Sequence, residues 1–339
     1  MIIQLKKNIT LKQKEKILNQ LEKISIPARP LKTNFKEYIV GIPKTEFDLR
    51  QIGNLPGIDD IHRVSDSYKM VSKKWKLHNT VIDLGDNIRI GTDELAIMSG
   101  PCAIESESQI ESIVEHLLKN NVRIMRGGVY KPRSSPYSFR GLGIEGLKLF
   151  YKHCSQNGIK VITEVMQVSQ VEKMLDFVDI FQVGARNSQN FNLLDVLGQV
   201  DKPVMIKRGI SGTIDELLYS AEYVFSSGNE KILLCERGIR TFEKATRNTL
   251  DLSAIPVLKE KTHLPVIVDP SHGVGIRKHV PQMALAGVIS GADGVIMEIH
   301  ETPEKAFSDG QQSLYYEQAT KLYDELREIK ILSNRFGYS

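Results

Sequence analysis

The feature that most constrains the fold is a pattern repeated eight times between Leu95 and Asp309: a short apolar segment, a polar or reactive residue, and an amphipathic segment of helical period. The apolar segments are Leu95–Gly100, Val122–Arg126, Lys160–Glu164, Asp179–Val183, Pro203–Lys207, Lys231–Glu236, Pro265–Asp269 and Gly294–Glu298. Near-continuous apolar strands that alternate with helices are typical of parallel strands buried on both faces. Eight such units predict an α/β fold, the closed (β/α)8 or TIM barrel, whose chemistry lies at the carboxyl ends of the strands.

A smaller unit precedes the repeat. Residues 1–64 predict the order βαββαβ, which is typical of a ferredoxin-like fold. Its expected elements are a strand Ile2–Leu5, a helix from Thr10 to about Ile24, strands Ala28–Leu31 and Tyr38–Ile42, a short helix Thr45–Ile52 and a strand Gly57–Val64. Thr10 and Thr45 are the expected helix caps, because a hydroxyl can accept a hydrogen bond from a free backbone N–H.

The two predicted domains are joined by a polar, basic segment. Residues 65–79 carry Lys69, Lys73, Lys74 and the only tryptophan, Trp75, so we expect a linker with a solvated lysine face. Residues 80–339 then form the barrel domain. Two short apolar segments that flank Leu84–Asn87 predict a hairpin, which would close the bottom of the barrel.

Composition excludes several classes of protein. The net charge of +4 over 339 residues is too small to indicate nucleic-acid binding. Three cysteines form no disulfide framework and fit a reducing compartment. No apolar run approaches the ~18 residues that a membrane span needs, and the first residues lack the apolar core of a signal peptide. We therefore expect a cytoplasmic protein that contacts neither nucleic acid nor membrane.

Four potential metal ligands follow neighbouring strands of the predicted barrel. Cys102 follows the first strand, His272 the seventh, Glu298 ends the eighth, and Asp309 lies in the loop after it. A thiolate, an imidazole and two carboxylates suit a borderline divalent ion such as Mn, Fe, Co or Zn, among which the sequence does not choose. A lone cysteine is usually an apolar filler, and Asp309 could simply cap a turn. Convergence of all four is harder to explain by such separate roles, so spacing alone supports a metal site and separate structural roles about equally.

Positive side chains gather at the same predicted rim. Arg126, Lys131 and Arg133 follow the second strand together with the hydroxyl of Ser134. Arg186, Lys207 and Arg237 end the fourth, fifth and sixth strands. These cations would repel one another unless an anion joined them, although Glu164 or Glu236 could pair with one or two. Arginine binds phosphate through charge-assisted hydrogen bonds, so the pattern predicts two phosphorylated substrates.

These motifs together resemble a known enzyme family. They are Gly100-Pro101-Cys102-Ala103, Lys131-Pro132-Arg133-Ser134-Ser135, Gly184-Ala185-Arg186-Asn187, Ile206-Lys207-Arg208-Gly209, Cys235-Glu236-Arg237-Gly238 and Asp269-Pro270-Ser271-His272. The barrel resembles 3-deoxy-D-arabino-heptulosonate 7-phosphate (DAHP) synthase of type I beta. Residues 1–64 are similar to the regulatory domain of the longer members of that family.

The resemblance implies a reaction and a role for each residue. Phosphoenolpyruvate and erythrose 4-phosphate would condense with water, in the first step of the shikimate pathway, at a divalent metal. By the family pattern, the metal ligands are Cys102, His272, Glu298 and Asp309, the phosphoenolpyruvate ligands are Arg126, Lys131, Arg186, Lys207 and Arg237, and the erythrose 4-phosphate ligands are Arg133 and Ser134.

Catalysis would then depend on Lys131, Cys102 and His272. Lys131 is expected to give a proton to the developing alkoxide. Glu164 and the metal site are both candidates for activating the water. The resemblance further implies a homotetramer and feedback inhibition by tyrosine or phenylalanine, with the small domain covering the barrel mouth.

Two alternatives have different signatures. The first is 3-deoxy-manno-octulosonate 8-phosphate synthase, which typically has Ala and Asn between the Lys and Arg where this chain has only Pro132. That family also usually lacks the additional N-terminal domain. The second is a non-catalytic amino-acid sensor, which would not need four potential metal ligands at the ends of strands.

Overall fold

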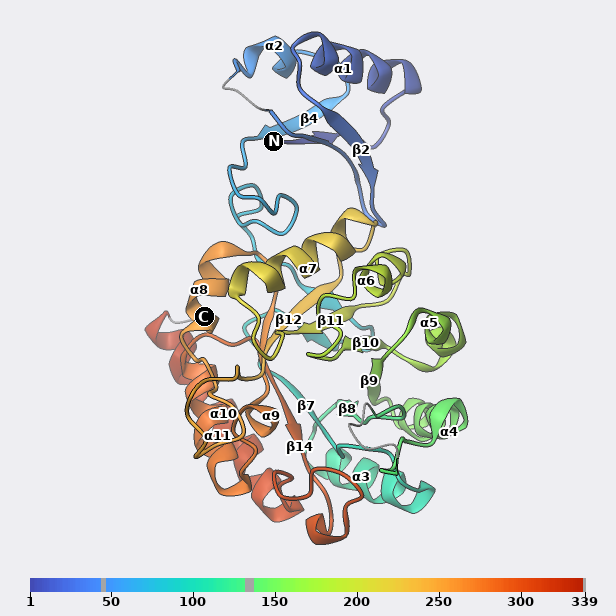
Figure 1. Cartoon of the computed structure of the whole chain (residues 1–339), viewed down its shortest axis with the longest axis vertical. Coiled ribbons are helices and arrows are strands. Elements are labelled where there is room, and N and C mark those ends of the chain that lie inside the picture. Colours follow the sequence, from blue (N-terminus) through green and yellow to red (C-terminus); the bar gives the residue numbers. More distant parts are fainter. Residues whose placement is uncertain (44–46, 132–136, 338–339) are drawn as a thin grey trace.

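The computed structural model describes residues 1–43, 47–131 and 137–337. Figure 1 shows two parts, a small N-terminal unit at one end and a larger barrel wrapped by helices. Among the described residues, no helix is both long enough and apolar enough to cross a membrane.

The larger part is a closed parallel barrel of eight strands, as predicted. The strands are β7 (Ala96–Gly100), β8 (Ile124–Arg126), β9 (Lys160–Val165), β10 (Ile180–Val183), β11 (Val204–Lys207), β12 (Ile232–Glu236), β13 (Val266–Val268) and β14 (Gly294–Glu298). They pair in chain order, and β14 closes the ring by pairing with β7. The bounds of each strand agree with those of one predicted apolar segment to within about two residues.

Helices surround this barrel on its outside (Figure 1). The outer helices are α3 (Glu107–Lys119), α4 (Gly143–Gln156), α5 (Val168–Met174), α6 (Phe191–Leu197), α7 (Ile214–Ser226), α8 (Ala254–Lys261), α10 (Val280–Ile289) and α11 (Tyr316–Phe336). Neighbouring strand residues are buried on opposite sides. Ile162 and Ile180 belong to the interior cluster, while Val161 and Phe181 pack in the outer core. Burial on both faces explains the near-continuous apolar strands.

A hairpin closes the bottom of the barrel, as the sequence predicted. Its strands are β5 (Ile82–Asp83) and β6 (Arg89–Ile90), joined through Gly85, Asp86 and Asn87, which all have positive φ. Ile82 and Ile90 are buried in the same cluster as the side chains that fill the barrel interior. Lys160, at the start of β9, pairs with Asp86 at 2.8 Å, which fixes the hairpin at the bottom end.

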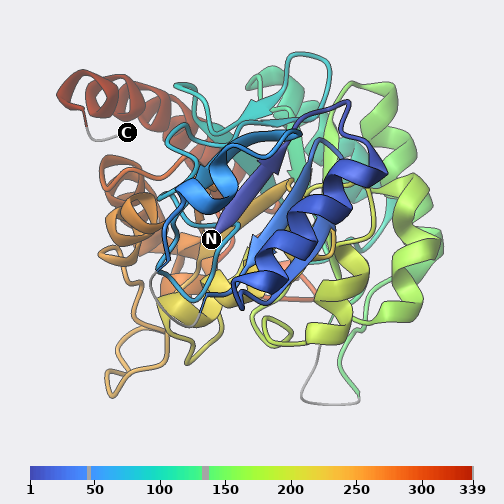
Figure 2. The same ribbon diagram turned by 90° about the horizontal axis from the view of Figure 1, so that it is seen from above.

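The N-terminal unit is a separate four-stranded antiparallel sheet in the order β2-β3-β1-β4. Its elements are β1 (Ile2–Leu5), α1 (Leu11–Lys23), β2 (Ala28–Lys32), β3 (Glu37–Gly41), α2 (Arg50–Gly53) and β4 (Ile58–His62). Figure 2 shows α1 lying across one face of this sheet. Thr10 caps α1 as predicted, and its side chain exchanges hydrogen bonds with Gln13 in a capping box.

The predicted helix Thr45–Ile52 is wrong in extent. Residues 47–49 are not helical, and α2 comprises only Arg50–Gly53. The Asp48 carboxylate accepts a hydrogen bond from the backbone N–H of Arg50 at 3.0 Å, which favours a turn at the place where the longer helix was expected. Thr45, the expected cap, lies outside the described residues.

Residues 65–79 contain no helix or extended strand, yet they are not a loose linker. Met70, Val71 and Trp75 are buried. The Glu222 carboxylate on α7 accepts hydrogen bonds from the backbone N–H groups of Met70 and Val71. Lysine side chains here bind protein groups: Lys69 donates to backbone carbonyls and Lys74 pairs with Asp66. The expectation of a solvated lysine face is therefore only partly met.

The sheet contacts the barrel at the end opposite the mouth. Tyr38 donates its hydroxyl hydrogen to the buried Glu230 carboxylate at 3.1 Å, and Thr33 donates to the same carboxylate. Asn34 contacts Gly228 and Asp201. These barrel residues lie in loops that lead into β11 and β12. Within this chain the small domain does not cover its own barrel mouth, contrary to the arrangement expected for inhibition.

Candidate functional site

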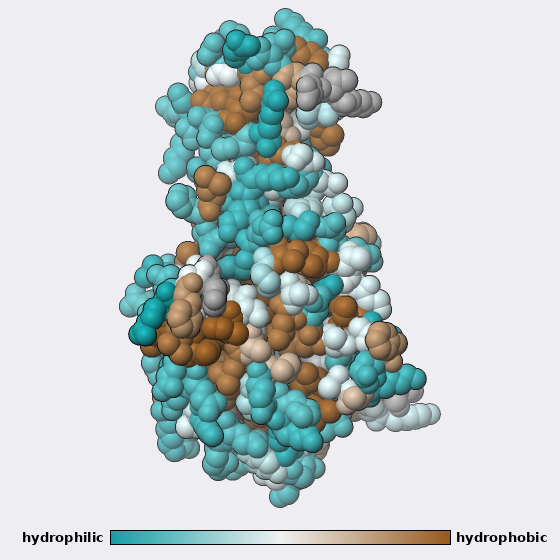
Figure 3. Space-filling view, turned by 90° about the vertical axis from the view of Figure 1, so that its left-hand side faces the viewer, coloured by the Kyte–Doolittle hydropathy of each residue, from teal (hydrophilic) through white to brown (hydrophobic). Residues whose placement is uncertain are grey.

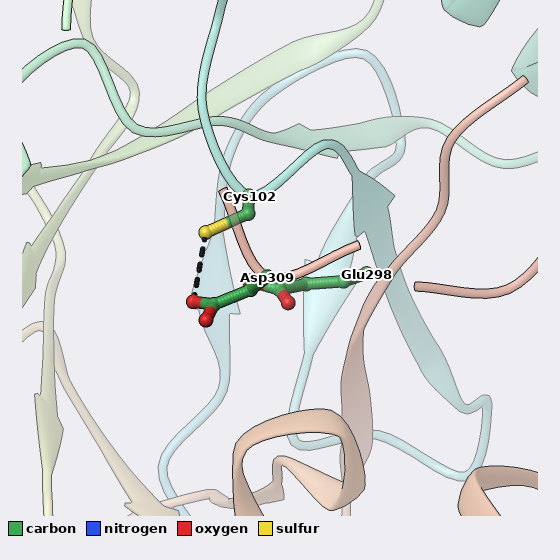
Figure 4. A group of neighbouring side chains, drawn as sticks. All are labelled: Cys102, Glu298 and Asp309. Carbon is green, nitrogen blue, oxygen red and sulfur yellow. Dashed lines mark hydrogen bonds between the residues drawn. The ribbon is translucent and has the colours of Figure 1, made fainter. Parts of the chain in front are cut away.

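Three of the four predicted metal ligands lie together at the mouth of the barrel. The Cys102 sulfur and one carboxylate oxygen each from Glu298 and Asp309 all lie within 4.8 Å of one another (Figure 4). Cys102 follows β7, Glu298 ends β14, and Asp309 lies in the loop after β14. The Cys102 thiol donates to Asp309 Oδ2 at 3.2 Å. One soft and two hard donors suit a borderline divalent cation.

The fourth predicted ligand, His272, contacts this cluster from the next strand. Its Nε2 lies 3.3 Å from Glu298 Oε1, although the group within 4.8 Å does not include it. Its Nδ1 lies 2.8 Å from Asp269 Oδ2. A carboxylate partner favours a hydrogen on Nδ1, which leaves the Nε2 lone pair available to a cation. Cys102 and His272 therefore lie at the same end of the barrel, as predicted.

The local sequence explains these positions. In Asp269-Pro270-Ser271-His272, the Asp269 side chain caps the short helix α9 (Pro270–Val274) by accepting from the backbone N–H of His272, with proline at the first helical position. On β7, Gly100 lies opposite Glu298 in the register. A Cβ atom at Gly100 would lie 2.0 Å from the Arg126 carbonyl oxygen, so only glycine allows this approach to β8.

The protonation states of Cys102 and Asp309 are compatible with binding of a cation. Burial, together with the charge of Glu298, raises the pKa of the Cys102 thiol to about 12, so the free sulfur keeps its proton. Burial also disfavours ionisation of Asp309, but His272 and Arg247 outweigh it and lower the pKa of that carboxyl to about 2. Binding of a divalent cation would displace the thiol proton. The donor chemistry therefore fits a metal ion.

The five described cations predicted to bind phosphoenolpyruvate line a single pocket. They are Arg126, Lys131, Arg186, Lys207 and Arg237. Glu164 lines the same pocket, and so do Asp309 of the three-residue cluster and His272 beside that cluster. The structure thus places the predicted anion site beside the predicted cation site.

Pairing with nearby acids accounts for only some of these cations. Arg126 Nη1 contacts Glu298 Oε1 at 2.8 Å, and Lys207 Nζ contacts Asp269 Oδ2 at 2.5 Å. Glu236 was an expected partner, but it pairs with Arg208 at 2.9 Å.

Two guanidinium groups remain available to an anion. Among the described residues, Arg186 and Arg237 form no direct ion pair with an acidic side chain, although the charges of Asp269 and Glu236 act on Arg237. Arg237 is only 6% exposed, and burial lowers its pKa. A buried guanidinium without a carboxylate is costly unless an anion binds there.

Lys131 lies between the two predicted sites. Its Nζ donates to the Cys102 carbonyl oxygen at 3.1 Å, and its side chain lines the cationic pocket. A Cβ atom at Gly128 would lie 2.7 Å from Lys131 Cδ, so the glycine makes room for the lysine side chain. The other two predicted substrate ligands, Arg133 and Ser134, lie outside the described residues.

Several residues of the mouth were not predicted from the sequence. Arg240, Arg247 and Asn248 line the pocket from the loop between β12 and α8. Gln312, fully buried, donates to Glu298 Oε2 at 2.6 Å and accepts from Arg247 at 2.9 Å. Proximity to a strand end could have indicated Arg240. No local signal marks Gln312, which lies 14 positions after Glu298.

Comparisons with known proteins agree with this geometry. The sequence profile of the DAHP synthetase I family matches residues 78–334. The phospho-2-dehydro-3-deoxyheptonate aldolase of Thermotoga maritima is 47% identical over 276 residues, which are 81% of each chain. The 2-dehydro-3-deoxyphosphooctonate aldolase of Syntrophobacter fumaroxidans is 34% identical over 73% of this chain and 92% of its own.

Solved structures extend the likeness to the whole chain. The crystal structure of the Thermotoga maritima enzyme, named DAHP synthase, superposes with a TM-score of 0.77 at 42% identity, covering 99% of this chain and 98% of that one. A truncated form of the Thermotoga maritima synthase gives a TM-score of 0.73 at 44% identity, covering 80% of this chain and 98% of that one. With a profile match over most of its length and a catalytic mouth of the expected composition, the chain belongs to the DAHP synthetase I family.

Proposed function

We propose that the barrel mouth binds phosphoenolpyruvate and erythrose 4-phosphate beside one divalent cation. The reaction of this chain is the aldol-type condensation of these substrates with water, which gives DAHP and phosphate. The Thermotoga aldolase named for the seven-carbon product is 47% identical, against 34% for the Syntrophobacter aldolase named for the eight-carbon product. Together with the single residue between Lys131 and Arg133, this difference favours erythrose 4-phosphate over a five-carbon sugar phosphate.

Cys102, His272, Glu298 and Asp309 would hold the cation. Their support is the cluster of three donor atoms within 4.8 Å and the contact of His272 with Glu298. Mn, Fe, Co and Zn all suit such a mixed set of ligands. When bound, the cation would act as a Lewis acid on the aldehyde oxygen of erythrose 4-phosphate.

The cations of the pocket would hold the phosphoenolpyruvate. Arg186 and Arg237 are available for its phosphate or carboxylate, since neither forms a direct ion pair among the described residues. Arg126, Lys131 and Lys207 line the same pocket. We assign the phosphate of erythrose 4-phosphate to Arg133 and Ser134 by family resemblance alone.

The chain's own side chains would then move protons. Lys131 lies next to the metal cluster, where it could donate a proton to the oxygen that becomes an alkoxide. Glu164 lines the same pocket and is our candidate for accepting a proton from the attacking water. Fixing both substrates in one pocket supplies a further part of the rate.

The observation that carries this proposal is the metal-type cluster next to the cationic pocket at a barrel mouth. The test measures phosphate release from phosphoenolpyruvate with erythrose 4-phosphate and, separately, with arabinose 5-phosphate. Faster release with erythrose 4-phosphate is expected, and a chelator should abolish it until a divalent ion is restored. Preference for arabinose 5-phosphate, or full activity in chelator, would overturn the assignment.

We also propose that residues 1–64 are a ferredoxin-like regulatory domain, 65–79 a connecting segment and 80–339 the catalytic domain of a type I beta enzyme. The sheet order β2-β3-β1-β4 with two helices supports the fold. We expect a cytoplasmic homotetramer inhibited by tyrosine or phenylalanine. A chain that starts near Leu77 should stay active and lose this inhibition, whereas inhibition that persists would place the effector on the barrel.

A further inference from the structure

A single buried carboxylate connects the two halves of the mouth. Asp269 is 1% exposed, and its Oδ2 contacts both Lys207 Nζ at 2.5 Å and His272 Nδ1 at 2.8 Å. Lys207 lines the cationic pocket, while His272 contacts the metal cluster. One oxygen atom therefore has a partner in each proposed binding site.

We infer that Asp269 is a positioning residue that couples binding of the cation to binding of phosphoenolpyruvate, an inference that rests on the proposed function. Asp269 contacts neither proposed ligand itself. It acts through His272, whose imidazole it orients, and through Lys207, whose ammonium it holds at the pocket wall. Partners of this kind behind a metal-binding histidine typically change metal affinity 10- to 100-fold.

Orientation of His272 is fixed at three points. Asp269 Oδ1 accepts from the backbone N–H of His272 at 3.0 Å, Oδ2 lies 2.8 Å from its ring nitrogen, and proline at the first helical position limits the backbone. The imidazole held in this way presents its Nε2 to Glu298. A preset ligand avoids the loss of side-chain freedom that binding would otherwise require.

The shared oxygen also gives the coupling a sign. An anion that binds Lys207 weakens the ion pair between Lys207 and Asp269. The carboxylate then accepts a stronger hydrogen bond from His272, which makes the imidazole a better metal ligand. A cation bound to His272 in turn strengthens the hydrogen bond between His272 and Asp269. The ion pair between Asp269 and Lys207 then weakens, so that the ammonium can bind phosphate. By linkage, each ligand must tighten binding of the other by the same factor.

The chain offers a matched control at the opposite end of the barrel. Asp293 is also buried, at 4% exposed, and also pairs with a lysine, Lys259, at 2.7 Å. It accepts from the backbone N–H of Val266 and lies just before β14 instead of just after a strand. Replacing it removes a buried aspartate–lysine pair of the same kind without touching the mouth.

The test titrates the full-length apo-protein with Co²⁺, following the absorption of the cobalt–thiolate bond, with and without saturating phosphoenolpyruvate. For wild type we expect phosphoenolpyruvate to lower the Kd for Co²⁺ about tenfold. Asp269→Asn should weaken Co²⁺ binding 10- to 100-fold and reduce the tightening to about twofold or less. Asp293→Asn should lower thermal stability and leave both quantities unchanged.

A second variant separates the two contacts of Asp269. Lys207→Met removes the ammonium's pull on Asp269 and keeps the carboxylate on His272, so Co²⁺ affinity without phosphoenolpyruvate should rise toward the value that wild type shows with it, and phosphoenolpyruvate should then tighten Co²⁺ binding no further. A folded Asp269→Asn with wild-type Co²⁺ affinity, or with undiminished tightening, would overturn the inference but leave the proposed function intact. A wild-type protein that binds no Co²⁺ would overturn both.

Discussion

The two ends of the same barrel are built from opposite kinds of residue. At the mouth, Glu298 and Asp269 are each 1% exposed and lie among buried cations. At the bottom, Ile82 and Ile90 of the hairpin fill the interior and are almost fully buried. Buried ion pairs are weak sources of stability because desolvation opposes them. The bottom should therefore support the fold, whereas the mouth should support the reaction, and substitutions at each end test that division.

The largest effect is expected from Cys102→Ala at the mouth. Loss of one donor from the cluster should reduce kcat/KM by at least about 10³-fold, or about 4 kcal/mol, because the cation would no longer be held for Lewis-acid chemistry. The midpoint temperature of thermal unfolding should change little, whereas kcat/KM should fall by the stated factor. Steady-state kinetics with added divalent ion check this, and near-normal turnover would show that the sulfur is not a ligand.

The converse experiment is Ile90→Ala in the bottom hairpin. Removing a fully buried aliphatic side chain should lower the free energy of unfolding by about 3 kcal/mol, since it loses burial and leaves a cavity. Denaturant unfolding measures this loss. At a temperature where the variant is folded, its affinity for the cation should equal that of wild type; a matching loss of affinity would erase the distinction between the ends.

A smaller change at the mouth is expected from Arg186→Ala. This exposed arginine lines the cationic pocket, so its loss should raise KM for phosphoenolpyruvate about 30-fold, equivalent to about 2 kcal/mol for a charge-assisted hydrogen bond. Arg123→Ala is the control, because Arg123 is exposed near the bottom and donates to the Gly158 carbonyl. Equal KM values for the two variants would remove Arg186 from the substrate site.

The smallest effect concerns His263, near the bottom. Burial, and then the charge of Lys76, lower its pKa to about 3, below an unfolded value of about 6.5. The unfolded chain therefore binds the proton more readily, and stability should fall as pH drops below about 6.5.

Replacing this histidine isolates its contribution. Between pH 7.5 and 5.5, His263 should account for about 1 kcal/mol of lost stability, and His263→Gln should reduce the pH dependence by that amount. Urea unfolding at both pH values measures the difference. An unchanged slope would mean that the ring protonates within the folded protein.

The sequence predicted the barrel well because its signal is local. Each strand is a short apolar run, and a reactive residue such as Cys102 or Lys207 follows directly. Chain order then determines which strand ends are neighbours, so convergence of Cys102 with Glu298 can be inferred from the sequence alone. The short helix α2 was harder, because a single side-chain contact from Asp48 decides where it begins.

Partners within the mouth could not be predicted in the same way. Glu236 contacts Arg208 although Arg237 is adjacent in sequence, because successive strand residues point to opposite sides. Gln312 and Arg247 meet from loops 65 positions apart. Residues 65–79 were likewise expected to be solvated because of their composition. No local pattern shows that Glu222 accepts hydrogen bonds from the backbone of this segment.

Trp75 gives the chain an optical reporter of its own. The ring lies 5.7 Å from Tyr38 of the N-terminal sheet and 5.8 Å from His263 of the barrel, measured between ring centroids. No other tryptophan is present in the sequence. If the small domain left its present surface, this indole would gain water, and its emission would shift to longer wavelength. Fluorescence of the unlabelled protein can therefore follow domain separation in real time.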